Sequence, residues 1–217
     1  MRENGLMSMA EERRQFERLL DEVLAQLEFK LQPDQVAVLF QHYTLLRRWN
    51  RRINLTGIRN SEDIVQRHFG ESLLVAKVIG SGTGQVVDVG SGAGFPGVPI
   101  AVSWPGRSVV LVESVAKKAA FLKEIARQVG NITVQQKRFE EFSGAVEWVT
   151  LRGVAVDGVW ERIRLGAERV AVTVSTGQVS EMQTRLGLES AVQHKVPWET
   201  RTTVLEGKMG GLSSTWN

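Results

Sequence analysis

The feature that most constrains the fold is a short apolar run that ends in a cluster of glycines, Val86-Val87-Asp88-Val89-Gly90-Ser91-Gly92-Ala93-Gly94-Phe95-Pro96-Gly97. Branched residues around a single aspartate predict a strand that is buried on both faces, because a half-exposed strand alternates polar and apolar residues. Pro96 and Pro99 fall early in the apolar segment that follows, and proline is tolerated in the first turn of a helix. The segment therefore predicts a strand, a glycine loop and a helix N-terminus, an arrangement that binds the anionic end of a nucleotide-like ligand.

The glycine spacing fits two classes of enzyme. Gly90-x-Gly92-x-Gly94 is the pattern of methyltransferases that bind S-adenosylmethionine, whereas Gly92-x-Gly94-x-x-Gly97 satisfies the dinucleotide fingerprint. A nicotinamide-dependent oxidoreductase is therefore an alternative. An oxidoreductase would need a catalytic group such as a tyrosine-lysine pair. The sequence offers none, since the only tyrosine, Tyr43, lies on the apolar face of a predicted helix.

Two acids accompany the glycines. A second apolar run, Val109 to Val112, ends in Glu113, and an acid about 20 residues after the glycines holds the two ribose hydroxyls in either enzyme class. Asp88 precedes Gly90 by two residues and suits a ligand that carries an ammonium group. The pattern therefore favours S-adenosylmethionine as the cofactor.

Three predicted helices precede the glycine segment. The first begins at the capping box of Ser8 and Glu11, the second runs from Pro33 to Ile53, and the third runs from Asn60 to Ile79. Strands and helices then alternate, which predicts a doubly wound, mostly parallel α/β sheet of Rossmann-like type beneath an N-terminal helical layer. These later elements are helices from Ser114 to Gly130 and around Val159 to Leu165, strands at Ile132 to Val134, Trp148 to Leu151 and Val170 to Val174, and a C-terminal antiparallel hairpin at Ala191 to Val196 and Thr202 to Leu205.

Length and composition bound the remaining choices. The 217 residues have room for one compact unit, which we divide into a helical extension, residues 1–84, and a methyltransferase core, residues 85–217. No long apolar run or signal-like segment is present, so we expect no membrane association and a cytoplasmic location. With no cysteine and three scattered histidines, we also expect no metal site. The sequence does not fix the oligomeric state, for which we favour a monomer.

An acid-free interval rich in arginine lies near the end of the second predicted helix. Arginine presents a planar fork that matches phosphate, so these side chains predict contacts with a nucleic-acid backbone. The alternative is a solvated helix end, where cations gain some tenths of a kcal/mol from the helix dipole. The RNA-binding candidates are Arg47, Arg48, Arg51 and Arg52, which we expect to form one basic strip, together with Arg59.

Further candidates follow the third and fourth predicted strands. Phe139 and Glu140 suit an adenine, because the phenyl ring of Phe139 offers a packing surface and the Glu140 carboxylate can accept from the exocyclic amine of the base. Arg152 closes an otherwise apolar strand on the same edge of the sheet, where ligands bind in open α/β folds. Arg138 and Arg152 are therefore also candidates for a catalytic role.

Several motifs together resemble the ribosomal RNA small-subunit methyltransferase G family, also called glucose-inhibited division protein B. The resemblance extends from about Leu45 to Val156. The motifs are Trp49-Asn50 with Ile53-Asn54-Leu55-Thr56, Arg67-His68 with Glu71-Ser72, the block from Asp88 to Pro99, Lys117-Lys118 with Phe121-Leu122, and Arg138-Phe139-Glu140-Glu141.

The resemblance implies transfer of a methyl group from S-adenosylmethionine to N7 of one guanine in small-subunit (16S) ribosomal RNA, either free or in an assembling small subunit. By position, the family's cofactor contacts would be Gly90, Phe95, Phe139, Glu140 and Arg152. We add Gly92, Gly94 and Glu113 from the glycine and acid pattern.

The chain departs from the family pattern in its C-terminal part. The family has an arginine-alanine pair where this chain has Arg152-Gly153, and a lysine-glycine pair where this chain has Ser175-Thr176-Gly177-Gln178. A cation expected near the RNA is therefore missing or supplied elsewhere. This departure supports a further alternative, a non-catalytic RNA-binding protein with the same fold.

Overall fold

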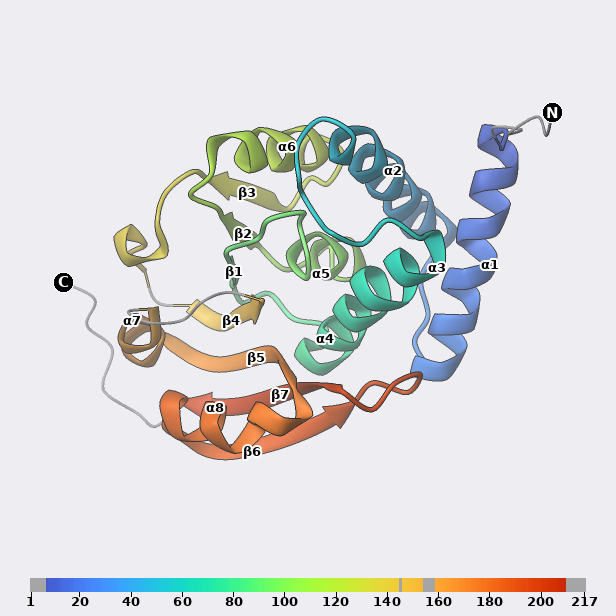
Figure 1. The fold of residues 1–217 in the computed structure, drawn as a ribbon. Coiled ribbons are helices and arrows are strands. Elements are labelled where there is room, and N and C mark those ends of the chain that lie inside the picture. Colours follow the sequence, from blue (N-terminus) through green and yellow to red (C-terminus); the bar gives the residue numbers. More distant parts are fainter. Residues whose placement is uncertain (1–6, 145, 154–158, 210–217) are drawn as a thin grey trace.

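A seven-stranded sheet forms the centre of the computed structural model, which describes residues 7–144, 146–153 and 159–209 (Figure 1). The strand order is β3-β2-β1-β4-β5-β7-β6, in which β1 to β5 pair in parallel and β7 pairs antiparallel with both β5 and β6. This arrangement confirms the predicted mostly parallel α/β sheet and its C-terminal hairpin. The strands are β1 (Val86–Val89), β2 (Val109–Val112), β3 (Ile132–Gln135), β4 (Val146–Arg152), β5 (Ala167–Ser175), β6 (Leu188–Lys195) and β7 (Thr202–Met209).

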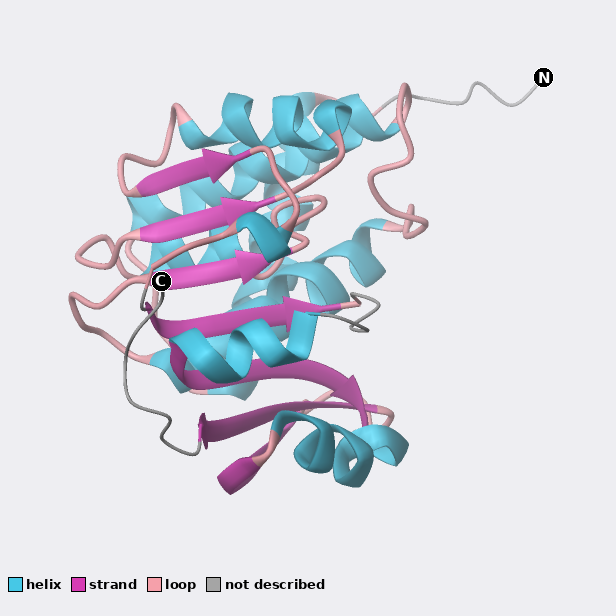
Figure 2. Cartoon of the chain, turned by 90° about the vertical axis from the view of Figure 1, so that its left-hand side faces the viewer, coloured by secondary structure: helices cyan, strands magenta, loops and turns pink. Residues whose placement is uncertain are grey.

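Helices cover both faces of this sheet (Figures 1 and 2). One face packs against α4, α5 and α6, with α1 and α2 outside them, and the other face packs against α7 and α8. Alternate residues of β1 point to the two faces, so Val86 joins one core cluster and Val87 the other. No helix in the described ranges combines the length and apolarity needed to cross a membrane. The helices are α1 (Met9–Leu27), α2 (Pro33–Asn50), α3 (Ser61–Asp63), the π-helical η1 (Ile64–Gly70), α4 (Glu71–Ile79), α5 (Gly97–Ser103), α6 (Ala116–Ala126), α7 (Val159–Gly166) and α8 (Val179–Leu186).

The helical layer follows the prediction with two corrections. Ser8 and Glu11 form the predicted capping box of α1. However, α2 ends at Asn50 rather than at Ile53. The reason is the Asn50 side chain, which accepts from two backbone N–H groups and donates to the carbonyl of Thr56, so that it supports a loop instead of another helical turn. The third predicted helix contains the seven-residue π-helical segment η1, for which the sequence pattern offers no signal.

Three corrections concern the core. Ser114 does not cap α6, which begins at Ala116 after Val115, and α6 ends at Ala126 instead of Gly130. The prediction also missed α8, although Val179, Met182 and Leu186 recur at helical spacing. The end of the predicted region of resemblance, Val156, lies outside the described residues.

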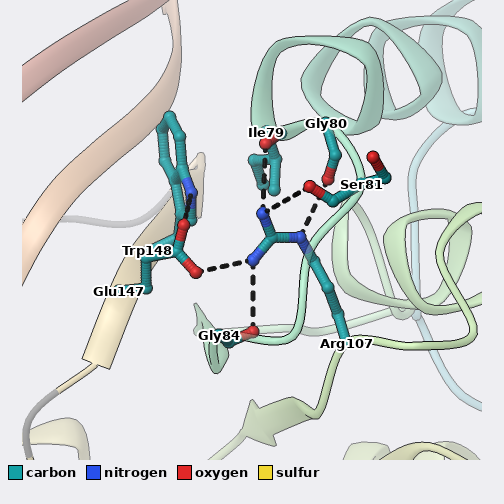
Figure 3. Close-up of polar contacts among 7 residues, drawn as sticks. All are labelled: Ile79, Gly80, Ser81, Gly84, Arg107, Glu147 and Trp148. Atoms are coloured by element: carbon teal, nitrogen blue, oxygen red, sulfur yellow. Dashed lines mark hydrogen bonds and ion pairs between the residues drawn. The ribbon is translucent and has the colours of Figure 1, made fainter.

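A buried arginine organises the amino-terminal edge of the sheet (Figure 3). The Arg107 side chain is 3% exposed and donates to the backbone carbonyls of Ile79, Gly80, Ser81 and Gly84. It also pairs with a carboxylate oxygen of Glu147 at 2.8 Å and thereby holds the pKa of Glu147 below its usual value. The guanidinium therefore joins β4 to the glycine-rich connection before β1.

Candidate functional site

A cavity of about 240 Å³ opens at the carboxyl ends of the parallel strands. Open α/β sheets bind their ligands at this edge. The cavity brings together four of the predicted site residues, Gly90, Arg138, Phe139 and Glu140, from two separate loops. Its lining is Val89, Gly90, Val112, Ser114, Lys137, Arg138, Phe139, Glu140 and Val159.

The glycine loop between β1 and α5 requires glycine for two different reasons. Gly90, Gly92 and Gly94 all have positive φ angles, a region that side chains with a Cβ rarely adopt. At Gly92 a Cβ would meet only the Gly90 carbonyl at 3.7 Å, so this position is open. At Gly94 a Cβ would lie 2.8 Å from Val98 and 3.3 Å from His42. Gly94 therefore faces the protein interior and serves packing, whereas Gly92 leaves space above the loop.

Glu113 connects the glycine loop to the end of β2. Its two carboxylate oxygens accept from the backbone N–H of Gly92 at 2.9 Å and from that of Val115 at 2.8 Å. The residue is 5% exposed. Each carboxylate oxygen has a second lone pair, so the predicted acceptance from ribose hydroxyls stays a prediction. The structure adds a function that the sequence did not indicate, which is to hold Gly92 in place.

The structure gives Asp88 a role different from contact with a ligand ammonium group. Its carboxylate is 1% exposed and accepts from the N–H of Gly97 at 3.1 Å and from the hydroxyl of Thr150 at 3.2 Å. A Cβ at Gly97 would lie 2.2 Å from Leu111 and 2.7 Å from the Asp88 carboxylate. Asp88 thus fixes the first turn of α5 against β1 and β4. Burial raises the pKa of Asp88 to about 7.

Phe95 lies between two histidine rings and does not line the cavity. Its ring centroid is 4.7 Å from that of His42 and 4.8 Å from that of His68. His42 extends from α2 and shares a 2.8 Å hydrogen bond with the Ala93 carbonyl, which makes Nε2–H the donor. Burial lowers the pKa of His42 to about 4. The helical layer therefore supports the glycine loop from beneath, and Phe95 contributes to that support.

Arg152 belongs to a hydrogen-bonded cluster that the sequence did not reveal. Its guanidinium donates to Glu71 at 2.8 Å, to the Arg67 carbonyl at 2.8 Å and to Nδ1 of His68 at 3.0 Å. Because arginine only donates, Nδ1 of His68 is the acceptor, and Nε2–H donates to the Thr56 hydroxyl at 2.8 Å. Burial, aided by Arg152, lowers the pKa of His68 to about 3. Besides Arg152, the residues of this cluster come from motifs of the resemblance to which the sequence had assigned no role, namely Thr56, Arg67, His68 and Glu71.

The basic residues in the last turn of α2 and in the loop after it do not form one strip. Arg47 pairs with Glu12 of α1 and also contacts the Tyr43 ring. Arg48 pairs with Glu124 of α6. The other three arginines, Arg51, Arg52 and Arg59, are exposed and have no acidic partner among the described residues. The loop that carries them lies on the side of the sheet toward which the parallel strands point (Figures 1 and 2).

The segment that replaces the expected lysine-glycine pair lines a separate cavity. Ser175 donates to the side chain of Gln178 at 2.8 Å at the end of β5. Gly153 and Arg185 of α8 line the same cavity, and Arg185 pairs with Glu181 at 2.8 Å. Among the described residues that line this cavity, the cation is therefore Arg185 of α8.

Comparisons with known proteins are consistent with this geometry. The family model for GidB, rRNA small subunit methyltransferase G, matches residues 35–170. Ribosomal RNA small subunit methyltransferase G of Xylella fastidiosa strain 9a5c is 42% identical over 146 residues, which cover 64% of this chain and 68% of that protein. The protein of the same name from Cupriavidus pinatubonensis is 31% identical over 201 residues, which cover 76% of this chain and 86% of that protein.

Solved structures show the same fold at low sequence identity. A SAM-dependent methyltransferase from Aquifex aeolicus superposes with a TM-score of 0.55 at 13% identity and covers 68% of this chain and 93% of its own. Magnesium protoporphyrin IX methyltransferase from Synechocystis superposes with a TM-score of 0.54 at 16% identity, and the match covers 83% of this chain and 99% of the Synechocystis chain.

Proposed function

Because the chain belongs to the rRNA small subunit methyltransferase G family, we propose that it transfers the methyl group of S-adenosylmethionine to N7 of one guanine in small-subunit (16S) ribosomal RNA. The observation that carries the proposal is the family match over residues 35–170, which includes the cavity-lining loops and the helices beneath them. The substrate is either the free RNA or an assembling small subunit, and such a substrate implies a cytoplasmic location. Incubation of both substrates with labelled S-adenosylmethionine, followed by nucleoside analysis, tests the proposal.

The cavity at the strand ends suits the adenosine part of S-adenosylmethionine. Val89, Val112 and Phe139 supply an apolar lining, and Glu140 offers an acceptor for an exocyclic amine. Glu113 keeps free lone pairs beside the open glycine loop, where the ribose hydroxyls would donate. Arg152 and Phe95 would act through the support that they give to the neighbouring helices and to the loop.

The proposed reaction requires positioning more than acid-base chemistry. S-adenosylmethionine supplies an electrophilic methyl group on a sulfonium centre. The in-plane lone pair of guanine N7 is free at neutral pH, so no side chain has to remove a proton before the attack. The protein then contributes by holding the nucleophile and the methyl group in line at about 3 to 3.5 Å. Arg138 lines the cavity and is exposed, and we propose that it contacts the RNA.

The two alternatives gain no support from the structure. The oxidoreductase alternative lacks its tyrosine, because Tyr43 is buried in the helical layer and donates to Ser61. The non-catalytic alternative rested on the changed segment after β5, which does not line the proposed cofactor cavity. Family membership therefore favours the methyltransferase.

The different environments of the arginines lead to a prediction about RNA binding. Replacing Arg51 and Arg52 with glutamine should weaken RNA binding and lower its log-log salt dependence by about 0.7 for each phosphate of single-stranded RNA that the variant no longer neutralises. The same double change at Arg47 and Arg48 should leave the salt dependence closer to that of the wild type, because these side chains already pair with acids. Titrations at several salt concentrations measure both slopes. Equal slopes in the wild type and the first variant would show that the exposed arginines do not contact phosphate.

A further inference from the structure

A second cavity, of about 360 Å³, lies between the C-terminal end of α2 and α6. Among the described residues, none lines both this cavity and the cofactor cavity. Its lining is Arg48, Trp49, Arg52, Ile53 and Glu124. An aromatic ring, an aliphatic side chain and two guanidinium groups therefore surround one space large enough for a small organic group.

Contacts within the protein hold the Trp49 ring in place. Its indole N–H donates to Glu124 at 2.8 Å, and its ring meets the edge of Phe121 at a centroid distance of 5.9 Å and an interplanar angle of 72°. The backbone N–H groups of Arg52 and Ile53 both donate to the Trp49 carbonyl, at 2.8 and 3.0 Å. The chain thus folds back over Trp49 and brings these two residues to the same cavity. A ring that is already fixed loses little conformational freedom when a ligand binds.

The charges around this ring favour an anionic ligand. One carboxylate oxygen of Glu124 pairs with Arg48 and the other accepts from Trp49, so the acid is compensated. Arg52 has no acidic partner in the described part of the chain, which leaves one guanidinium available at the cavity. A fixed aromatic face beside an available arginine is the combination that binds a base and its phosphate in single-stranded RNA.

From these contacts we propose that the Trp49 cavity binds one unpaired nucleotide of the substrate RNA, with the base against Trp49 and the phosphate at Arg52. The proposal rests on the proposed function, since it assigns a second RNA contact to the same enzyme. The two cavities lie at opposite ends of α6. Ser114, which lines the cofactor cavity, precedes this helix, and Glu124, which lines the Trp49 cavity, is near its C-terminal end. At 1.5 Å per residue, Ala116 and Glu124 are about 12 Å apart along the helix. The bound nucleotide therefore flanks the target guanine and is not the target.

The test combines Trp49→Leu with abasic nucleotides placed one at a time along an RNA fragment that contains the methylated guanine. At one flanking position the abasic RNA should bind the wild type about 5- to 150-fold more weakly, the range that corresponds to one base-aromatic stack. The same abasic substitution should have no effect on the Trp49→Leu variant, because the partner of the base is already absent. A merely structural role of Trp49 would not produce this dependence on one nucleotide.

Two further variants keep the test decisive. Trp49→Phe retains a ring and should restore most of the RNA affinity and the sensitivity to the abasic position. Arg52→Gln changes an exposed side chain, so folding is not at stake, and it should remove the effect of a methylphosphonate at the same nucleotide. Arg18→Gln on α1, which removes the same charge from a side chain that does not line the cavity, serves as the matched control.

The outcomes separate this inference from the proposed function. Affinity for S-adenosylmethionine without RNA should be the same in the wild type and all of these variants. If the wild type methylates ribosomal RNA but every abasic position affects the wild type and Trp49→Leu equally, the inference is wrong and the function stands. If the wild type transfers no methyl group to ribosomal RNA, the proposed function is wrong.

Discussion

Replacing Arg107 with leucine should lower the free energy of unfolding by at least about 1–3 kcal/mol, the cost of leaving a buried hydrogen-bond acceptor without its donor. The guanidinium is 3% exposed and donates to four backbone carbonyls besides Glu147. Without it, the buried Ile79 carbonyl has no donor, and the partly buried carbonyls of Gly80, Ser81 and Gly84 each lose a charge-assisted hydrogen bond. Urea denaturation of the wild type and the variant measures the difference.

An exposed arginine provides the control for this variant. Arg18→Leu on α1 removes a guanidinium that is 62% exposed and whose only acidic partner in the described part of the chain is Glu22, one helical turn away. A pair of this kind contributes about 0.2–0.5 kcal/mol, so the control should unfold almost like the wild type. Similar decreases in stability in the two variants would show that the Arg107 contacts do not hold the edge of the sheet together.

Substitution of Gly92 by valine should abolish detectable binding of S-adenosylmethionine while the helical content is retained. Gly92 has φ near +55°, a conformation that costs an L-residue roughly 1–2 kcal/mol and is least compatible with a branched side chain. Among the described residues, the atom nearest to a Cβ at this position is the Gly90 carbonyl oxygen at 3.7 Å. The valine side chain would therefore occupy the open space above the loop, where we place the cofactor. Calorimetry measures the affinity and circular dichroism the helical content.

Gly130→Val is the matched control for this prediction. Gly130 follows α6, has no positive φ angle, and a Cβ there would meet no atom within 4 Å. This variant should bind S-adenosylmethionine like the wild type. A folded Gly92→Val protein with unchanged affinity would show that the cofactor does not approach the glycine loop.

Local sequence patterns predicted the elements that depend on near neighbours. The strand, glycine loop and helix around Gly90 follow from residue types within a few positions, and so does the capping box at Ser8. The hairpin of β6 and β7 was also found, because turn residues separate two runs with strand character. These features are determined by steric and hydrogen-bonding rules that act along the chain.

Partners that are distant in sequence could not be predicted in this way. Arg152 meets Glu71 across 81 positions, and Arg48 meets Glu124 across 76. A spacing pattern shows that an arginine is present but not which carboxylate the fold brings to it. For this reason the sequence assigned Arg152 to the cofactor and placed Arg47 and Arg48 in one strip, whereas the structure pairs these three arginines with acids of this chain.

The most direct test of the proposed function is methyl transfer to RNA that lacks the proposed nucleophile. The wild type is incubated with labelled S-adenosylmethionine and small-subunit ribosomal RNA, free or assembled, and mass spectrometry of nuclease fragments identifies the methylated guanine. A synthetic RNA is then made with 7-deazaguanine at that position, which replaces N7 by carbon and leaves the Watson–Crick edge intact. We predict one methyl group on N7 of a single guanine in the natural RNA and none on the 7-deazaguanine RNA. Methylation of the 7-deazaguanine RNA at that residue, or no transfer to the natural RNA in either form, would contradict the account.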